Sequence, residues 1–119
     1  MGTNCQVSGL ALPEGTGDEE YLEALEVALK QIFSRFEPEL VFYVSGADPY
    51  SGDRLGRLNL SKPGLGQRDQ LVMQYCEARN LPVAVSMAGG YAPDVNDIVD
   101  IHFQTVLIAH ESAKARQGI

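Results

Sequence analysis

Two residues with chemically useful side chains follow strand-like apolar runs. Asp48 lies just beyond the run at residues 40–44, where a carboxylate could bind a metal ion or act as a general base. An aspartate in a loop can equally cap backbone N–H groups, so its position alone leaves both roles open. Tyr91 follows Gly89 and Gly90, and its phenol could donate a hydrogen bond to an oxygen that gains negative charge. Aromatic residues pack more often than they catalyse, so a tyrosine that plugs the end of a sheet is the simpler alternative.

Two further groups of residues have simpler structural explanations. Gly15, Thr16 and Gly17 lack the third glycine of a dinucleotide-binding loop and the Lys-Ser/Thr ending of a P-loop. We interpret them as a loop that leads into a helix cap. Asp53 and Arg54 stand beside glycines, and we interpret them as an ion pair that holds its own loop in shape.

The histidines and cysteines match no metal or nucleophile motif. His102 and His110 are about two helical turns apart, which is too far for the usual metal-binding pair at i and i+4. Both are expected to be packed or surface residues. Cys5 and Cys76 are far apart in the chain, and we interpret both as reduced thiols, with Cys76 packed in a helix.

Three helices are predicted around these residues. The first opens at residues 16–19, where Thr16 and Glu19 have the spacing of a capping box, and it ends before Pro38. The second has Pro63 in its first turn, and the third begins at Pro93 or Asp94. The apolar side of the first helix is formed by Tyr21, Leu22, Leu25, Ala28, Leu29, Ile32, Phe33 and Phe36. That of the second is formed by Leu65, Leu71, Val72, Tyr75 and Cys76. That of the third is formed by Val95, Ile98, Val99, His102, Phe103, Val106, Leu107 and His110.

Short apolar runs predict the strands between these helices. Residues 40–44 and 83–87 have the pattern of strands that are covered on both faces in a parallel sheet. A weaker strand signal lies at residues 7–12. The order (β)αβαβα predicts an α/β fold with a parallel sheet. Because ligands bind outside the carboxyl ends of such strands, a site is expected at the loops 45–63 and 88–93.

Composition narrows the possible functions. The chain has 119 residues, of which 45% are hydrophobic and 21% charged, as expected for a globular domain. Its net charge of −7 disfavours nonspecific binding to DNA or RNA. No apolar run is long enough to span a membrane, and the start of the chain does not resemble a signal peptide. A cytoplasmic protein that binds neither nucleic acid nor membrane is therefore expected.

Three motifs stand at or near the two loops: EPELVFYVSGAD at residues 37–48, GDRLG at residues 52–56 and AGGY at residues 88–91. Together they resemble the C-terminal part of the histone deacetylase family, with class IV-like and bacterial members nearest. That family includes bacterial acetoin-utilisation proteins and acetylpolyamine amidohydrolases. Residues 13–22 also resemble the stretch that precedes these motifs in the family. Residues 1–119 are thus interpreted as a single α/β segment of a larger catalytic domain with the arginase/deacetylase fold.

The resemblance implies a reaction and roles for five residues. The family hydrolyses acyl-lysine or related acyl-amine amides by means of a zinc-bound water. By this resemblance, Asp48 is one of three protein ligands of Zn²⁺, and Tyr91 donates a hydrogen bond to the substrate carbonyl. Leu55 lines the acyl channel, and Gly89 and Gly90 let the backbone approach that channel.

Other functional residues of the family precede these motifs. They are an Asp-x-His pair of zinc ligands from an earlier strand and a His-His pair that acts as general acid and base. We recognise neither pair in this chain, and we interpret His102 and His110 as lying in the wrong segment to replace them. The isolated chain is therefore expected to be catalytically incomplete and to hold zinc weakly. Two alternatives stay open: a non-catalytic module that self-associates, and a chain that pairs with a separate N-terminal half.

Overall fold

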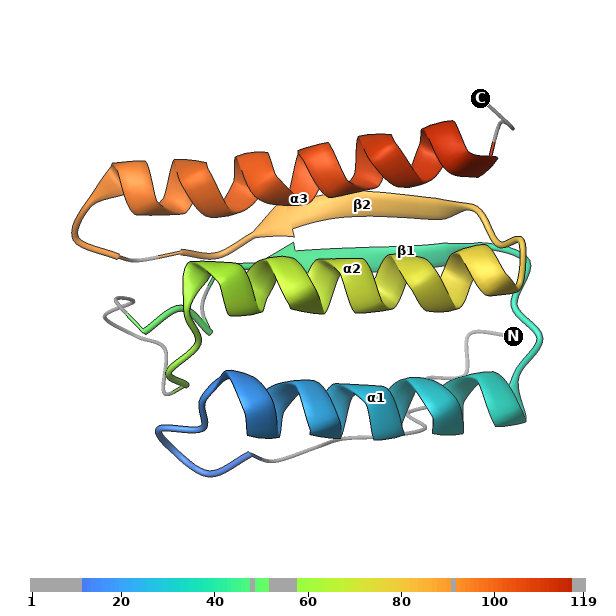
Figure 1. The fold of residues 1–119 in the computed structure, drawn as a ribbon, viewed down its shortest axis with the longest axis horizontal. Helices are drawn as coiled ribbons and strands as arrows, with labels where there is room; N and C mark the ends of the chain where they lie inside the picture. Colours follow the sequence, from blue (N-terminus) through green and yellow to red (C-terminus); the bar gives the residue numbers. More distant parts are fainter. Residues whose placement is uncertain (1–11, 48, 52–57, 91, 117–119) are drawn as a thin grey trace, which may run out of the picture.

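The computed structural model describes residues 12–47, 49–51, 58–90 and 92–116. Its elements are α1 (Asp18–Arg35), β1 (Val41–Gly46), α2 (Lys62–Ala78), β2 (Val83–Ala88) and α3 (Val95–Arg116), as Figure 1 shows. This order confirms the predicted alternation of helices and strands. The strand predicted at residues 7–12 lies outside the described residues, except for Leu12, which is in no strand. Within the described ranges, none of the helices is both long and apolar enough to cross a membrane.

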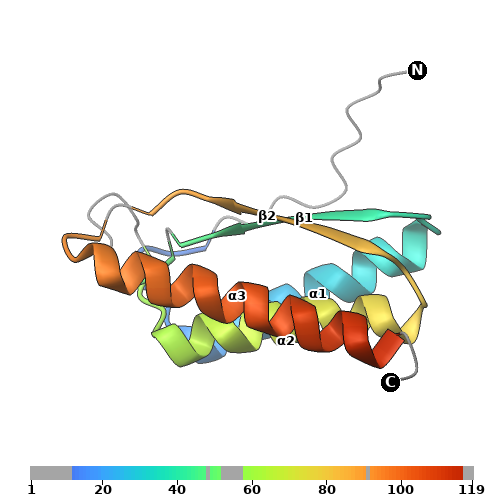
Figure 2. The same ribbon diagram turned by 90° about the horizontal axis from the view of Figure 1, so that it is seen from above.

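β1 and β2 form a parallel pair, in register from Val41 opposite Val83 to Gly46 opposite Ala88. The helices α1, α2 and α3 all lie on one side of this pair (Figure 2). On the other side Phe42 and Val44 are 75% and 63% exposed. The prediction that both faces are covered is therefore wrong for the described part of the chain. The apolar run identified the strand correctly, but the described residues supply only one covering layer.

Two hydrophobic clusters fix the helices against the sheet. One joins Leu29 of α1 to Val72 and Cys76 of α2, which confirms that Cys76 is packed in a helix. The other lies near the carboxyl ends of the strands and consists of Ala47, Leu60, Leu65 and Ile101. On α2, Met73 is buried, whereas Leu71 and Tyr75, predicted on its buried side, are half-buried. The face of α2 turned to the sheet is thus rotated slightly from the predicted one.

The prediction of which side of α3 is buried is largely wrong. Ile101 and Thr105 are its buried residues, whereas Val95, Val99 and Phe103 are 56–65% exposed. The helix packs on α2 through the face that carries Ile101, and the more apolar opposite face has no covering layer among the described residues. Apolar periodicity located the helix, but it did not indicate which side the described core would bury.

The starts of α1 and α2 are joined by one carboxylate. The capping box predicted at residues 16–19 is absent: the hydroxyl of Thr16 instead donates to the backbone oxygen of Pro13 at 2.6 Å. Asp18 accepts hydrogen bonds from the backbone N–H of Ser61 at 2.8 Å and from its hydroxyl at 2.5 Å. Because Ser61 is itself the N-cap of α2, Asp18 fixes where the loop after β1 returns to the core.

Substituting Gly64 by alanine should test this junction. A Cβ atom at position 64 would overlap the carboxylate of Asp18, so Asp18 would have to turn away and release Ser61. We expect Gly64→Ala to lower the free energy of unfolding by about 1–3 kcal/mol, because the better helix propensity of alanine offsets only part of the loss. Urea denaturation measures the effect. Gly17→Ala is the control, because its Cβ would have its nearest neighbour at 3.9 Å; equal stabilities would contradict the prediction.

Candidate functional site

The carboxyl ends of β1 and β2 lie side by side, as the parallel topology predicts. The backbone N–H of Ala47 donates to the oxygen of Ala88 at 3.2 Å, one step beyond the last paired residues of the strands. Gly89 and Gly90 then adopt φ angles of 69° and 118°, which favour glycine. A Cβ atom at position 90 would lie 3.3 Å from Cβ of Ala47 and 3.1 Å from Ile98. The glycines thus let the two loops pass close to one another.

Three of the five predicted site residues, Asp48, Leu55 and Tyr91, lie outside the described residues. The structure brings together the residues that directly precede two of them, Ala47 and Gly90. Gly90 lies close to the side chains of Ala47 and Ile98. The role of the two glycines beside a substrate channel stays a prediction.

A metal site is not formed by the described residues, which contain no group of three or more His, Cys, Asp or Glu side chains that could hold an ion. Asp48 is outside this set, so its role as a zinc ligand stays a prediction. Asp100 and His102 do have Asp-x-His spacing, which sequence reasoning overlooked. They lie on α3, where exposed Asp100 pairs with Lys62 at 2.9 Å and His102 is half-buried. This pair therefore differs from the strand-borne pair of the family.

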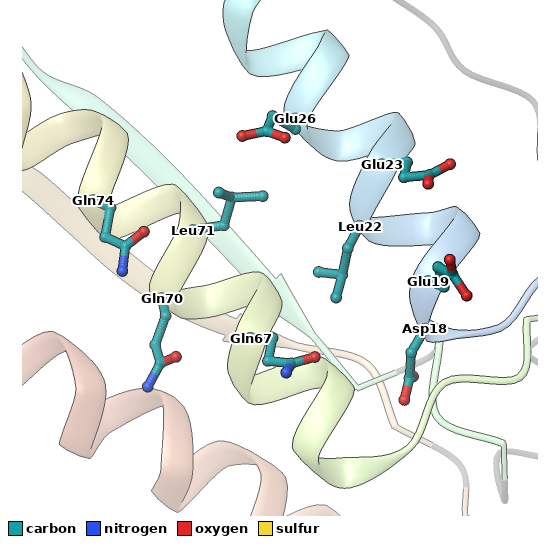
Figure 3. Close-up of a pocket in the computed structure, with 9 residues that line it drawn as sticks. All are labelled: Asp18, Glu19, Leu22, Glu23, Glu26, Gln67, Gln70, Leu71 and Gln74. Atoms are coloured by element: carbon teal, nitrogen blue, oxygen red, sulfur yellow. The ribbon is translucent and has the colours of Figure 1, made fainter.

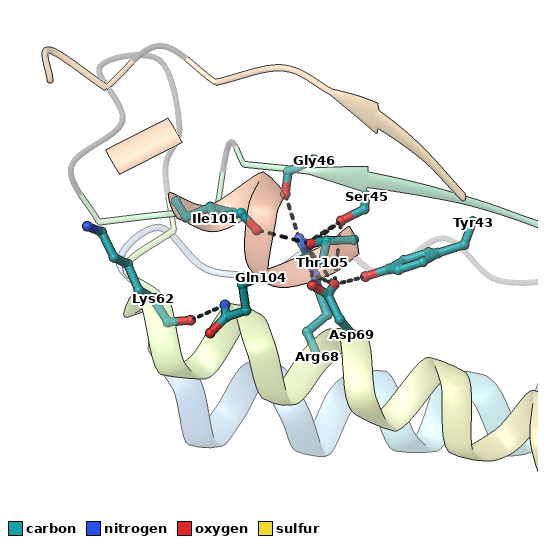
Figure 4. A network of polar contacts seen from close by, with 9 residues as sticks. All are labelled: Tyr43, Ser45, Gly46, Lys62, Arg68, Asp69, Ile101, Gln104 and Thr105. Carbon is teal, nitrogen blue, oxygen red and sulfur yellow. Dashed lines mark hydrogen bonds and ion pairs between the residues drawn. The ribbon is translucent and has the colours of Figure 1, made fainter. Parts of the chain in front are cut away.

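A buried polar network lies directly beneath the carboxyl end of β1 (Figure 4). Asp69 of α2 is fully buried and forms an ion pair with the neighbouring Arg68, with both Nε and Nη2 of Arg68 at 3.0 Å from its Oδ1. The same carboxylate accepts hydrogen bonds from Tyr43 of β1, at 2.5 Å, and from Thr105 of α3. One carboxylate thereby connects β1, α2 and α3.

Arg68 extends this network to the carboxyl end of β1. Its Nη1 donates to the backbone oxygen of Gly46 at 2.6 Å, and its Nη2 donates to the hydroxyl of Ser45 at 2.8 Å. Gly46 is the last residue of β1 and stands two positions before Asp48. The network therefore fixes the backbone from which the loop carrying Asp48 departs.

Sequence reasoning missed Arg68 and Asp69, although a signal for them was present. The buried positions of α2 follow helical spacing from Leu65 through Val72 to Cys76, and residues 68 and 69 fall on the same face. Charged residues on the apolar face of a helix must be paired when they are buried. Adjacent opposite charges at such positions are the pattern that could have identified the pair.

The phenol of Tyr43 should make stability depend on alkaline pH. Burial raises its pKa well above the ordinary value of 10; the charge of Arg68 opposes the shift, and Asp69, as charge and as acceptor, adds to it. The unfolded chain loses this proton first, so the contribution is complete below pH about 10 and is lost as the pH rises further. We expect the free energy of unfolding to fall above pH 10 by up to about 1.4 kcal/mol per pH unit from this group.

Urea denaturation between pH 9 and 11 measures this slope. Lys62 contributes with the same sign, because hydrogen bonds to Asp97 and Asp100 raise its pKa. Tyr43→Phe isolates the phenol: the variant should be less stable at pH 8 and should show a shallower decline above pH 10. An unchanged slope in Tyr43→Phe would contradict the prediction.

A groove of about 580 Å³ lies between α1 and α2 (Figure 3). Leu22 and Leu71 point into it, and acidic residues of α1, among them Glu19 and Glu23, line its rim. It lies between two helices rather than at the carboxyl ends of the strands, where α/β sheets bind ligands. The strand ends remain the candidate site.

Comparisons with known proteins agree with this geometry. A family model described as the histone deacetylase domain matches residues 2–106. An uncharacterized protein of Picosynechococcus sp. is 44% identical over 93 residues, which are 78% of this chain and 31% of that protein. Histone deacetylase 2 of Arabidopsis thaliana is 40% identical over 77 residues, or 65% of this chain and 20% of that protein. An acetylpolyamine aminohydrolase from Burkholderia pseudomallei has a similar structure, with a TM-score of 0.70 and 22% identity, covering 84% of this chain and 27% of that one.

The parallel strand pair, its crossover helix and its structural neighbours place the chain among α/β proteins of the arginase/deacetylase fold. With the family model matched over most of its length, the chain belongs to the histone deacetylase family. It spans about a third or less of the length of the relatives and the structure that it matches.

Proposed function

We propose that this chain is the C-terminal part of a zinc-dependent deacetylase that hydrolyses acyl-lysine or related acyl-amine amides. The observation that carries the proposal is the meeting of the two strand ends. The contact between Ala47 and Ala88 and the close approach of Gly90 to Ala47 bring the starts of both loops to one edge of the sheet. Asp48 and Tyr91, which follow these residues in the sequence, could therefore act on one substrate.

Each predicted residue has a distinct role in this proposal. Zinc, when bound, polarises an acyl carbonyl and lowers the pKa of water, and Asp48 is one of the side chains that would hold it. The phenol of Tyr91 donates a hydrogen bond to the carbonyl oxygen, where negative charge develops during the attack of water. Leu55 forms part of the wall of the acyl channel. The remaining metal ligands and the general base are contributed by polypeptide outside these 119 residues.

The competing proposal is a non-catalytic module that self-associates. The observation that favours it is the uncovered sheet face, where Phe42 and Val44 are exposed. An apolar surface of this kind marks an interaction site in many soluble proteins. The two proposals differ in what should happen when the rest of a deacetylase domain is supplied.

A chimera provides that test. In it, this chain replaces the 93 matched residues of the Picosynechococcus relative. We expect the purified chimera to contain zinc and to release acetate from an acetyl-lysine peptide or an acetylated polyamine, whereas the isolated chain should do neither. Asp48→Ala in the chimera should lower the zinc content, and Asp94→Ala, at an exposed position, should leave it unchanged.

The outcomes separate the proposals. A folded chimera without zinc and without hydrolysis would overturn the deacetylase proposal. Stoichiometric zinc and robust hydrolysis by the isolated chain would overturn the claim that it is incomplete. Sequencing the DNA upstream of the Met1 codon adds independent information, because an open frame with His-His and Asp-x-His motifs is expected there.

A further inference from the structure

The groove between α1 and α2 has an apolar floor. Leu22 of α1 and Leu71 of α2 point into it from its two sides, and both are half-buried (Figure 3). The groove has a volume of about 580 Å³ and runs along residues 18–26 of α1 and 67–74 of α2. At a rise of about 1.5 Å per residue, this stretch of α1 is about 13 Å long, which is the length of about two turns of a further helix. We call this feature the α1–α2 groove.

The two walls of the groove differ in charge. The wall on α1 is acidic and carries Asp18, Glu19, Glu23 and Glu26. The wall on α2 is neutral and carries Gln67, Gln70 and Gln74. The lining residues, all of which lie in described parts of the chain, include no Lys or Arg. A ligand that complements the groove is therefore cationic on the side toward α1 and uncharged on the side toward α2.

Two of these carboxylates are available to bind a cation. Asp18 already holds Ser61, and Glu26 accepts a hydrogen bond from a tyrosine of α2 at 3.4 Å. Glu19 and Glu23 are exposed, and within the described structure no hydrogen bond or ion pair engages their side chains. Because they are four residues apart, they lie on one side of α1 and repel one another. A cation bound between them would remove this repulsion.

The helix dipole accounts for only part of the acidic wall. Carboxylates are favourable in the first turn of a helix, which explains Asp18 and Glu19, but the effect falls off beyond that turn. Glu23 and Glu26 lie further along α1. The residue four positions after Glu23 is Val27 rather than a basic residue, so Glu23 has no counter-charge at that position.

The walls of the groove favour a helical ligand over an extended one. Both walls are sides of α-helices, whose backbone groups are bonded within each helix, so an extended peptide would find no strand edge to pair with. A helix satisfies its own backbone groups and can place an apolar side chain into the space between two others.

The groove opens on the outer side of the helical layer. The residues of α2 that face the sheet, such as Asp69 and Val72, are buried, whereas those that line the groove are exposed or half-buried. Helices that cover a sheet form the outer layer of an α/β domain. The groove should therefore stay accessible when the chain is part of a longer protein.

We propose that the α1–α2 groove is a docking site for a cationic amphipathic helix of a partner protein. The helix places an apolar side chain between Leu22 and Leu71 and a Lys or Arg side chain against Glu19 and Glu23. Its other flank, toward the glutamines of α2, is polar and uncharged. A second copy of this chain fits poorly, because each copy has a net charge of −7. Neither zinc nor hydrolysis is involved, so this site is independent of the proposed function.

Two synthetic helical peptides test the charge requirement. Both are about 18 residues long, since shorter isolated helices are marginal in water, and both carry leucines at helical spacing among alanine and glutamine. One peptide has lysines along one flank of the leucine stripe, and the other has glutamates at the same positions. By fluorescence anisotropy, we expect the chain to bind the lysine peptide at least about tenfold more tightly, with a difference that shrinks as salt is added.

Variants of the acidic wall locate the binding site. Glu19→Lys/Glu23→Lys should reverse the preference, so that the glutamate peptide binds more tightly than the lysine peptide. Glu37→Lys/Glu39→Lys is the matched control, because it changes the net charge equally at exposed positions beyond the end of α1 and should keep the preference. Far-UV circular dichroism of each variant checks that it is folded. Glu23→Gln is the milder substitution and should weaken the lysine peptide by about threefold.

The apolar floor is tested in the same assay. Leu22→Gln should weaken the lysine peptide at least about fivefold, because it removes an apolar side chain that docking would bury. Val27→Gln is the matched control on the same helix, since Val27 is 53% exposed and lies outside the groove. It should leave the affinity unchanged. The chimera should bind the lysine peptide as tightly as the isolated chain does.

Several results would overturn the proposal. These are equal binding of the two peptides, a preference that Glu19→Lys/Glu23→Lys leaves intact, and loss of binding in the chimera. Binding that depends on Glu19 and Glu23 but is indifferent to Leu22→Gln would show only a general attraction of cations, and would also overturn it. An inactive chimera that binds the lysine peptide would refute the proposed function while supporting this docking site, and an active chimera that does not bind it would do the opposite.

Discussion

Replacing Asp69 by leucine is expected to lower the free energy of unfolding by about 3–5 kcal/mol, the cost of leaving one partner of a buried ion pair without the other. The side chain of Arg68 is 5% exposed, and its guanidinium would lose its counter-charge. The hydroxyls of Tyr43 and Thr105 would lose their acceptor in the same step. Urea denaturation, followed by far-UV circular dichroism, measures the change.

The double variant Arg68→Met/Asp69→Leu should be less destabilised than the sum of its two single variants. Removing both charges together avoids an unpaired buried charge, and apolar side chains can fill the space. Gln70→Leu is the matched control, since it lies next to Asp69 on the exposed side of α2 and should change stability by no more than about 0.5 kcal/mol. If Asp69→Leu costs no more than Gln70→Leu, the network does not stabilise the fold.

The network also contacts the end of β1. Arg68 of α2 donates a hydrogen bond to the backbone oxygen of Gly46, the last residue of the strand. Asp18 holds Ser61, where the loop after β1 returns to the core. The loop expected to carry Asp48 and Leu55 is therefore anchored at both ends by buried or half-buried charges.

Much of the fold could be predicted from local patterns. Continuous apolar runs located β1 and β2, Pro63 marked the first turn of α2, and the parallel arrangement followed from the order of the elements. The side on which each element is buried could not be predicted as well. Phe42 and Phe103 have the residue types of a core, yet both are more than half exposed, because burial depends on layers that the described residues do not supply.

The sequence predicted the location of the candidate site better than it predicted the residues that hold the site in place. The motifs placed Asp48 and Tyr91 at the strand ends, and the structure confirms that these ends meet. Helical spacing could have identified Arg68 and Asp69 on the buried face of α2, but it could not identify Tyr43, Ser45 and Thr105 as their partners, because these lie on other elements. Local periodicity contains no information about such partners.

A large effect is also expected on the hydrolytic activity of the chimera when Tyr91 is replaced. Tyr91→Phe should lower kcat by about 100- to 1000-fold, because it removes a hydrogen-bond donor to the oxygen on which charge develops. KM should change little, since the interaction is stronger in the transition state than with bound substrate. Steady-state hydrolysis of an acetyl-lysine peptide measures both constants, and metal analysis should show unchanged zinc content.

Tyr75→Phe is the matched control for this substitution. Tyr75 lies on α2, and its hydroxyl donates to Glu26 of α1 at 3.4 Å, on the helical side of the sheet. Loss of a phenol there should leave kcat unchanged. If both variants retain full activity, Tyr91 is a packing residue at the end of the sheet, and the oxyanion donor must come from elsewhere in the domain. A fall in kcat confined to Tyr91→Phe, at constant zinc content, would instead establish it as a catalytic residue.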